Sequence, residues 1–176
     1  MYVRLELWSN RPHLQQLLTG LHQLHCQKVL HLKQVFVPQP PIEYAESAAH
    51  LADAHMAHCR IVMENGRKLY FDMHDSHEIH LGGLAWCDVY YKRGFVAELA
   101  SISNKVRPYG LNYLVYDDQL DWHSLKRQFH FEAENWQRHL CGLFGLDRVL
   151  GGRFILPRVS QCEQAPRLGA YQTILF

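Results

Sequence analysis

Alternating apolar and polar positions predict a strand from Lys68 to Met73, in which the odd-numbered residues share one side and Asp72 falls on the other. The polar run that follows contains Asp75 and Ser76, residue types that cap helices, so a short helix is expected to begin near His77. The next strand is predicted at residues 89–91. A strand, a helix and a strand in this order predict a βαβ unit, whose ligands bind at the carboxyl ends of the strands.

The rest of the chain alternates between helical and extended patterns. Leucines at helical spacing predict an amphipathic helix that begins near Leu14, behind Pro12 and a cap at Ser9 or Asn10, and ends near Lys28. Residues 29–37 alternate as a strand, and the alanine-rich residues 44–58 favour a helix. The dipeptide at 65–66 is Asn-Gly, which predicts an antiparallel hairpin over residues 60–73.

The later residues predict a loop at 105–113, a helix at 122–143 and a strand at 171–176. The expected fold is therefore α/β, a Rossmann-like three-layer sandwich with a mostly parallel sheet and one antiparallel hairpin. Residues 1–157 are expected to form this domain. Residues 158–176 are expected to be a linker and a terminal strand, which either completes the sheet or starts a second domain.

Composition narrows the function classes. The 176 residues contain 18 Lys and Arg against 17 Asp and Glu, which disfavours nucleic acid as a partner. The five cysteines are an odd number without a CxxC pair, which indicates free thiols in a reducing compartment. No apolar run approaches the roughly 20 residues of a membrane span. We therefore expect a cytoplasmic protein without a transmembrane segment, and the sequence assigns it no cofactor.

The strongest candidate chemistry lies at the two predicted strand ends. His74 with Asp75 is the best acid–base pair, because an imidazole held by a carboxylate can accept a proton from a hydroxyl near neutral pH. Lys92 and Arg93 end the next strand, where they fit either a site for a phosphate or carboxylate or a solvated strand end. The sequence lacks the motifs GxSxG, GxGxxG and the Walker loop, which disfavours hydrolase, dinucleotide and nucleoside triphosphate functions.

Histidines raise the question of a metal. The 13 histidines include His74, His77 and His80, but capping by Asp75 and Ser76 explains part of this cluster without an ion. A second pair, His22 and Cys26, stands four residues apart on the first predicted helix, with His25 between them on the leucine face. Core or interface positions explain these residues more simply, and no metal site is assigned.

Three segments together resemble a group of bacterial glycosyltransferase-like proteins: FDMHDSHEIH, CDVYYKRGF and VRPYGLNY. The opening segment LLTGLHQLHCQKVLHLKQ is similar to the first helix and strand of that group, so the resemblance covers residues 11–116. It implies a two-domain enzyme of the GT-B type, with two Rossmann-like domains that face a cleft. The amino-terminal domain then binds the sugar acceptor, and the carboxyl-terminal domain binds the nucleotide-sugar donor.

The resemblance implies specific residues for the acceptor side. His74 or Asp75 is the expected base, Arg93 is the expected anion anchor, and the other expected substrate-binding residues are Ser76, Lys92, Tyr109, Gly110 and Asn112. The chain departs from the pattern because it ends at Phe176, so the donor site is expected in a missing second domain or in another chain. Two alternatives stay open: a non-catalytic interaction domain, with a homo-oligomer that buries Tyr171 to Phe176, and a small metal-dependent enzyme built on His74, His77 and His80.

Overall fold

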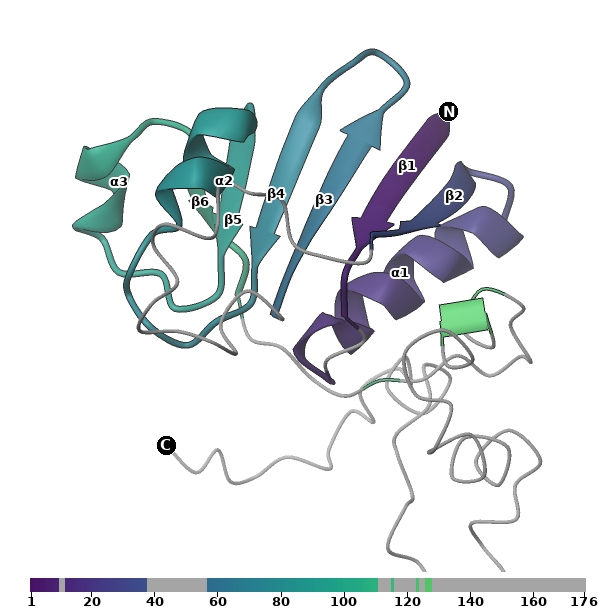
Figure 1. Cartoon of the computed structure of the whole chain (residues 1–176), viewed down its shortest axis with the longest axis horizontal. Coiled ribbons are helices and arrows are strands. Elements are labelled where there is room, and N and C mark those ends of the chain that lie inside the picture. Colours follow the sequence, from purple (N-terminus) through teal and green to yellow (C-terminus); the bar gives the residue numbers. More distant parts are fainter. Residues whose placement is uncertain (10–11, 38–56, 111–114, 116–122, 124–125, 128–176) are drawn as a thin grey trace, which may run out of the picture.

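The computed structural model describes residues 1–9, 12–37, 57–110, 115, 123 and 126–127. Its described part is an α/β fold built on a six-stranded mixed sheet (Figure 1). The strands are β1 (Tyr2–Leu7), β2 (His31–Phe36), β3 (His58–Met63), β4 (Lys68–Asp72), β5 (Val89–Lys92) and β6 (Val106–Pro108). The helical elements are a 3-10 turn η1 (Pro12–Leu14) and the helices α1 (Gln15–Cys26), α2 (Leu81–Trp86) and α3 (Leu99–Ile102).

The order of strands across the sheet is β2-β1-β3-β4-β5-β6. The pairs β1–β2, β4–β5 and β5–β6 are parallel, as expected for strands joined through helices. Strand β3 runs antiparallel to both of its neighbours, β1 and β4. The mostly parallel sheet and the antiparallel β3–β4 hairpin are thus confirmed, but the sequence did not predict that β3 would be inserted at the centre of the sheet.

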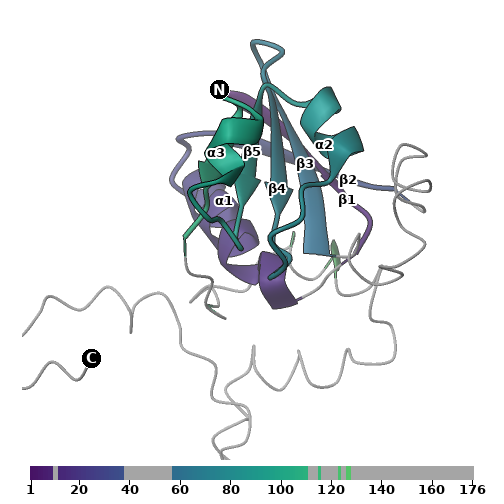
Figure 2. The ribbon, with the colours of Figure 1, turned by 90° about the vertical axis from the view of Figure 1, so that its left-hand side faces the viewer.

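Two apolar clusters lie on opposite faces of the sheet. On one face, Leu14 and Leu18 of the η1–α1 segment are fully buried against β1 and β3, in a cluster that includes Leu5, Ile61 and Phe71. On the other face, the α2 residues Leu84 and Trp86 pack with the following buried residues: Trp8, Tyr70, Tyr90, Leu99 and Val106. Figure 2 shows α1 and α2 on either side of the sheet. The central strands are therefore covered on both faces, which explains why β4 is buried despite its alternating pattern.

The β3–β4 hairpin forms where Asn65 and Gly66 predicted it. Gly66 has a φ of 82°, a left-handed conformation that glycine adopts without a steric cost. The Arg67 amide donates to Asn65 Oδ1 at 3.1 Å, and the Met63 amide donates to the Arg67 carbonyl at 2.9 Å. The local turn chemistry thus fixes the register in which β3 meets β4.

Several predicted boundaries are wrong. Helix α2 begins at Leu81, not near His77, because its first turn is capped by His80 and not by Asp75 or Ser76. The expected loop at 105–113 begins with strand β6, since Val106 packs in the core and the edge of a sheet tolerates Pro108. Strand β1 and helix α3 were not predicted, and the N-cap residue of α1 is Leu14, whose side chain makes no capping hydrogen bond.

Some predictions fall on residues that the structure does not describe. The alanine-rich helix at 44–58 lies outside the described residues except at its end, where His58 already belongs to β3. The helix at 122–143 and the segment 158–176 also lie outside them, apart from the isolated positions 123 and 126–127. Among the described residues, no helix is both long enough and apolar enough to cross a membrane.

Candidate functional site

All parallel strands end at the same edge of the sheet, and β3 begins there (Figure 1). The loops that meet at this edge follow β1, β4, β5 and β6. Helix α1 leads from β1 toward one side of the sheet, whereas α2 leads from β4 toward the other side and the other face. Such a reversal of the connections is the place where open α/β sheets bind their ligands. This edge is therefore the first candidate for a ligand-binding site.

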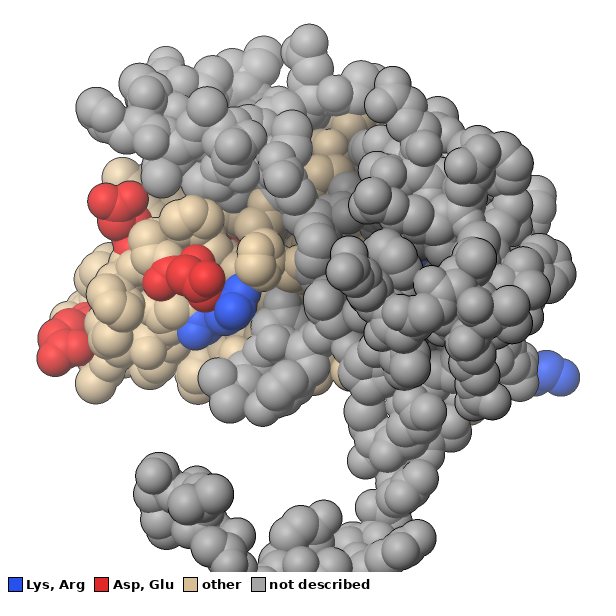
Figure 3. All heavy atoms as spheres, turned by 90° about the horizontal axis from the view of Figure 1, so that it is seen from below, with Lys and Arg blue, Asp and Glu red and all other residues tan. Residues whose placement is uncertain are grey.

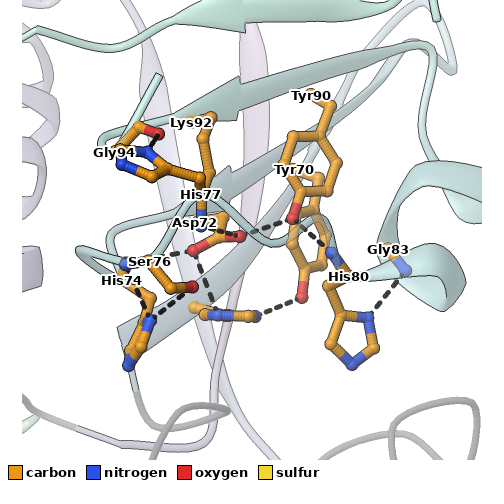
Figure 4. A network of polar contacts seen from close by, with 11 residues as sticks. Tyr70, Asp72, His74, Ser76, His77, His80, Gly83, Tyr90, Lys92 and Gly94 are labelled. Carbon is orange, nitrogen blue, oxygen red and sulfur yellow. Dashed lines mark hydrogen bonds and ion pairs between the residues drawn. The ribbon is translucent and has the colours of Figure 1, made fainter. Parts of the chain in front are cut away.

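A buried carboxylate, Asp72, is the centre of the polar side chains at this edge (Figure 4). It ends β4, where the strand register places it between His58 of β3 and Lys92 of β5. Its Oδ2 accepts from the Tyr90 hydroxyl at 2.5 Å and from Lys92 Nζ at 2.8 Å. Its Oδ1 lies 3.2 Å from His58 Nε2 and accepts from the His74 amide at 3.0 Å.

These contacts explain how an ionised carboxylate is accommodated where water is excluded. Burial by itself raises the pKa of Asp72, but the charges and hydrogen bonds of His58 and Lys92 outweigh burial and hold the pKa well below its usual range. The network continues through His58 Nδ1, which lies 2.6 Å from the Tyr70 hydroxyl, and the ring of Tyr70 stacks on that of Tyr90. A buried carboxylate with this many donors organises the strand ends around it.

Lys92 therefore differs from both interpretations offered by the sequence. Its side chain is 0% exposed and its ammonium is paired with Asp72, so it is neither a surface anchor for an anion nor a solvated strand end. The reason is the period of two in β5, which puts Tyr90 and Lys92 on the same buried face. Lys92 holds the β4 and β5 ends together below the loops that carry the exposed candidates.

His80 connects this network to α2. Its amide donates to the Tyr90 hydroxyl at 3.0 Å, and its Nδ1 accepts from the Gly83 amide at 3.1 Å, which caps the helix. Burial, followed by the nearby His58 and Arg60, lowers the pKa of His80 to about 4, although Asp72 opposes this shift. A neutral ring is also what the cap requires, because Nδ1 accepts a hydrogen bond only when it carries no proton.

An accessible chain of polar side chains lies on the same edge. Arg93, just after β5, is joined by its Nε to Asp75 Oδ1 at 3.2 Å and donates from its Nη1 to His13 Nδ1 at 2.7 Å. Asp75 is 71% exposed and Arg93 is 23% exposed. Figure 3 looks onto this edge and shows acidic and basic side chains against one another. The loops after β1, β4 and β5 are thus connected through one guanidinium.

The expected pairing of His74 with Asp75 is absent. Instead, His74 Nδ1 lies 2.9 Å from Ser76 Oγ and 3.2 Å from the Ser76 amide (Figure 4). Asp75 points to Arg93, because successive side chains in this extended turn leave the backbone in different directions. The structure therefore brings predicted site residues together in two pairs that were not predicted, His74 with Ser76 and Asp75 with Arg93. The histidine held by a carboxylate is His58.

Gly94 sets the distance between the loops after β4 and β5. A Cβ at this position would lie 2.5 Å from the carbonyl oxygen of Ser76 and 2.6 Å from that of Asp75, closer than real contacts allow. The Gly94 carbonyl also lies 3.0 Å from His77 Nδ1. Only glycine permits the two backbones to approach this closely, and the approach holds Asp75 within reach of Arg93.

Two of the remaining predicted residues, Tyr109 and Gly110, directly follow β6. The Tyr109 amide donates to the Lys92 carbonyl, but its ring packs edge-on against Phe71 on the α1 face, and burial raises its pKa to about 12. Gly110 has a φ of 93° and is exposed. Asn112 lies outside the described residues. Tyr109 also lines a groove of about 470 Å³ that runs along α1. Leu17, Leu21 and Leu24 of this helix line the same groove.

Within the described part of the chain, no group of three or more His, Cys, Asp or Glu residues is placed to hold a metal ion. The three histidines proposed for such a site point to separate partners: His74 to Ser76, His77 to the Gly94 carbonyl and His80 to the Gly83 amide. The structure therefore does not place these three histidines around one point, and the alternative of a metal-dependent enzyme built on them stays a prediction.

Four residues of these contacts were not predicted from the sequence: His13, His58, Tyr70 and Tyr90. The positions of Tyr90 and Lys92 could have been predicted. Side chains alternate between the two faces of a strand, so Tyr90 and Lys92 share one face of β5, as Tyr70 and Asp72 share one face of β4. No signal existed for His58 or His13. Each depends on which distant strand lies beside β4 and β5, and local patterns do not contain that information.

In comparisons with known proteins, no family model matches this sequence, and no curated protein or solved structure is significantly similar to it.

Proposed function

We propose that the described domain is the acceptor-side domain of a glycosyltransferase of the GT-B type, with a Rossmann-like sheet. The observation that carries this proposal is the connection of three loops by Arg93 at the carboxyl edge, where the direction of the strand connections reverses. The motifs that resemble bacterial glycosyltransferase-like proteins supply residues on two of these loops. The central antiparallel β3 is a departure from a Rossmann sheet, and it leaves this edge intact.

The neighbouring carboxylate of Asp75 and guanidinium of Arg93 have the hydrogen-bonding groups that bind a sugar. Asp75 accepts hydrogen bonds, Arg93 donates them, and vicinal hydroxyls of a sugar both donate and accept. The exposure of Asp75 leaves room for a hydroxyl to bind beside it, whereas Arg93 is held from below by its bond to His13. We assign these two residues to acceptor binding.

His74 is the proposed base. The Ser76 amide donates to His74 Nδ1 in the structure, which puts the proton of a neutral ring on Nε2. His74 accepts a proton at Nε2 when this bond is exchanged for one in which Nδ1–H donates to Ser76 Oγ. In the transfer, the acceptor oxygen forms a bond to the anomeric carbon of the donor while the bond from that carbon to the leaving diphosphate breaks. The hydroxyl proton moves to His74 Nε2. The donor is assigned to a second domain or chain, as the resemblance implies, so acceptor binding is the property to test on this chain.

The test is amide NMR of the isotope-labelled chain with a panel of neutral monosaccharides, uronic acids and the nucleotides UDP and GDP. We expect one class of sugar to shift the amides of residues 74–77 and 93–94. The variants Asp75→Asn and Arg93→Gln should abolish these shifts. Glu98→Gln is the matched control, because Glu98 is an exposed acid on the next segment whose side chain makes no capping bond.

Three results would count against the proposal: no shift with any sugar, shifts confined to other surfaces, or shifts that persist in both variants. Binding of UDP or GDP alone at residues 74–77 would also oppose it, since that edge would then be a nucleotide site. The alternative of a non-catalytic interaction domain depends on residues 171–176, which lie outside the described residues, and it stays a prediction.

A further inference from the structure

A thiol and an imidazole are in contact at the carboxyl end of α1. Cys26, the last residue of this helix, stands four residues after His22, which places the two side chains on the same side of the helix. Cys26 Sγ lies 3.2 Å from His22 Nε2. The thiol is exposed, whereas His22 is only 4% exposed. A sulfur nucleophile that reagents can reach, beside a base that the fold holds in place, is the arrangement that activates a cysteine.

We propose that Cys26 is a site of reversible modification by small disulfides, with His22 as the base that takes the thiol proton. The proton moves to His22 Nε2 while Sγ forms a bond to one sulfur of the disulfide. The bond between the two sulfurs of the reagent breaks, and the second sulfur leaves as a thiolate that takes up the proton. Cys26 is thereby oxidised to a mixed disulfide, and the reagent is reduced to one free thiol. Excess thiol reverses the reaction by the same exchange.

The surroundings of His22 keep its ring beside the thiol. The ring centroids of His25 and His123 lie 6.4 Å and 5.8 Å from that of His22. His25 is itself fixed, because the Leu32 amide donates to its Nδ1 at 3.3 Å. Buried packing against these rings restricts the rotation of His22, so its Nε2 stays directed at Cys26 Sγ.

The end of α1 is also built in a way that tolerates a thiolate. The carboxyl end of a helix normally disfavours negative charge, because its last carbonyl groups are unpaired. In α1, three of these carbonyl groups accept hydrogen bonds from backbone amides of the turn that follows, at 2.9–3.0 Å: those of Gln23, Leu24 and His25. Lys28, which makes this turn with a φ of 61°, adds a positive charge two residues after Cys26. The helix end therefore opposes a thiolate less than an open end would.

The other cysteines that the structure describes lack this setting. Cys59 is 0% exposed and Cys87 is 1% exposed. Burial raises the thiol pKa of both, and it raises that of Cys87 to about 11. Cys87 Sγ donates to the Leu84 carbonyl and not to an imidazole. Among the three described cysteines, only Cys26 thus combines exposure with a neighbouring base.

The experiment is the reaction of the whole, reduced chain with dithiodipyridine, a disulfide whose released thiopyridone is followed by absorbance. Peptide mass spectrometry at timed intervals assigns the rate to Cys26 and separates it from Cys141 and Cys162, which lie outside the described residues. We expect the rate at Cys26 to fall by at most about threefold from about pH 8 to about pH 6.5, whereas an ordinary thiol with a pKa of about 8.5 slows by roughly twentyfold. Incubation with glutathione disulfide should give a mixed disulfide at Cys26 that excess thiol removes.

Two variants separate the base from its neighbours. His22→Asn should restore the steep pH dependence and slow the reaction at about pH 6.5 by roughly tenfold. His31→Asn is the matched control and should keep the flat profile, because it removes an exposed imidazole whose ring lies 5.5 Å from that of His25. The proposal is overturned if the wild-type rate at Cys26 follows pH as an ordinary thiol does, or if a folded His22→Asn keeps the wild-type profile. Circular dichroism reports whether that variant folds, and the wild-type profile decides the question without it.

Discussion

His80 should make the stability of the fold depend on pH in a specific window. Its pKa is about 4 in the folded protein, against 6.5 for an unperturbed histidine. As the pH falls below about 6.5, the unfolded chain takes up a proton that the folded protein does not, so stability falls until the pH nears the folded pKa. The stabilisation is thus fully present above pH 6.5 and is lost as the pH falls toward 4.

The structure sets the size of this effect. The two pKa values differ by about 2.5, which corresponds to about 3.4 kcal/mol at 1.36 kcal/mol per unit. Because the ring is only partly buried, solvent screening reduces this figure, and we expect roughly 1.5 kcal/mol. Loss of the cap to Gly83 is part of the same change, since a protonated Nδ1 cannot accept the amide hydrogen.

The assay compares the wild-type chain with His80→Asn, which keeps a capping oxygen but cannot titrate. Urea unfolding curves between about pH 7.5 and pH 4.5 give the free energy of unfolding of each protein. The wild type should lose roughly 1.5 kcal/mol relative to His80→Asn across this range. A difference between the two proteins that does not change with pH would refute the reasoning. His77→Asn is the control, because it keeps His80 and should lose as much stability as the wild type when the pH falls. If the wild type loses as much relative to His77→Asn as relative to His80→Asn, the effect is not specific to His80.

Three further predictions concern the core and the loops. Lys92→Met should destabilise the fold by about 3–5 kcal/mol in urea unfolding, because it leaves the Asp72 carboxylate buried without its ammonium; an equal stability of the two proteins would contradict this. Gly94→Ala should cost about 1–3 kcal/mol and disturb the loop amides in NMR spectra, since its Cβ meets two carbonyl oxygens. Alkylation followed by mass spectrometry should find Cys26 modified well before Cys59, whose burial raises its thiol pKa; comparable rates would argue against the buried position of Cys59.

Local patterns predicted the parts of the fold whose causes are local. The Asn65–Gly66 turn, the leucine spacing of α1 and the alternation in β4 each depend on residues close in sequence, and each was confirmed. Strand β1 was missed although it alternates, and its place inside the sheet depends on pairing with β2 and β3. The helix start near His77 was wrong because Asp75 is bound by Arg93, a residue of the next loop.

The candidate site divides in the same way. The sequence predicted which residues lie at the strand ends, and Asp75 and Arg93 do meet there. It did not predict that Lys92 is buried, because that depends on Asp72 lying beside it and on cover from α2 and the second cluster. Charged residues at a strand end give the same sequence pattern whether they face solvent or a buried partner, and only the neighbouring strands decide between the two.

The central position of β3 also has a consequence for how the chain folds. The first residues of the protein form β1, which pairs on one side with β2 and on the other with β3, more than fifty residues later in the chain. The β3–β4 hairpin closes over a short turn and can form early, but the two halves of the sheet join only when β1 docks against it, a contact with a high cost in loop closure. Strand β1 is thus the element that joins β2 to the rest of the sheet. Deletion of residues 1–7 should leave a hairpin-centred half that does not fold cooperatively, whereas a similar deletion at an edge strand would leave the centre of the sheet paired.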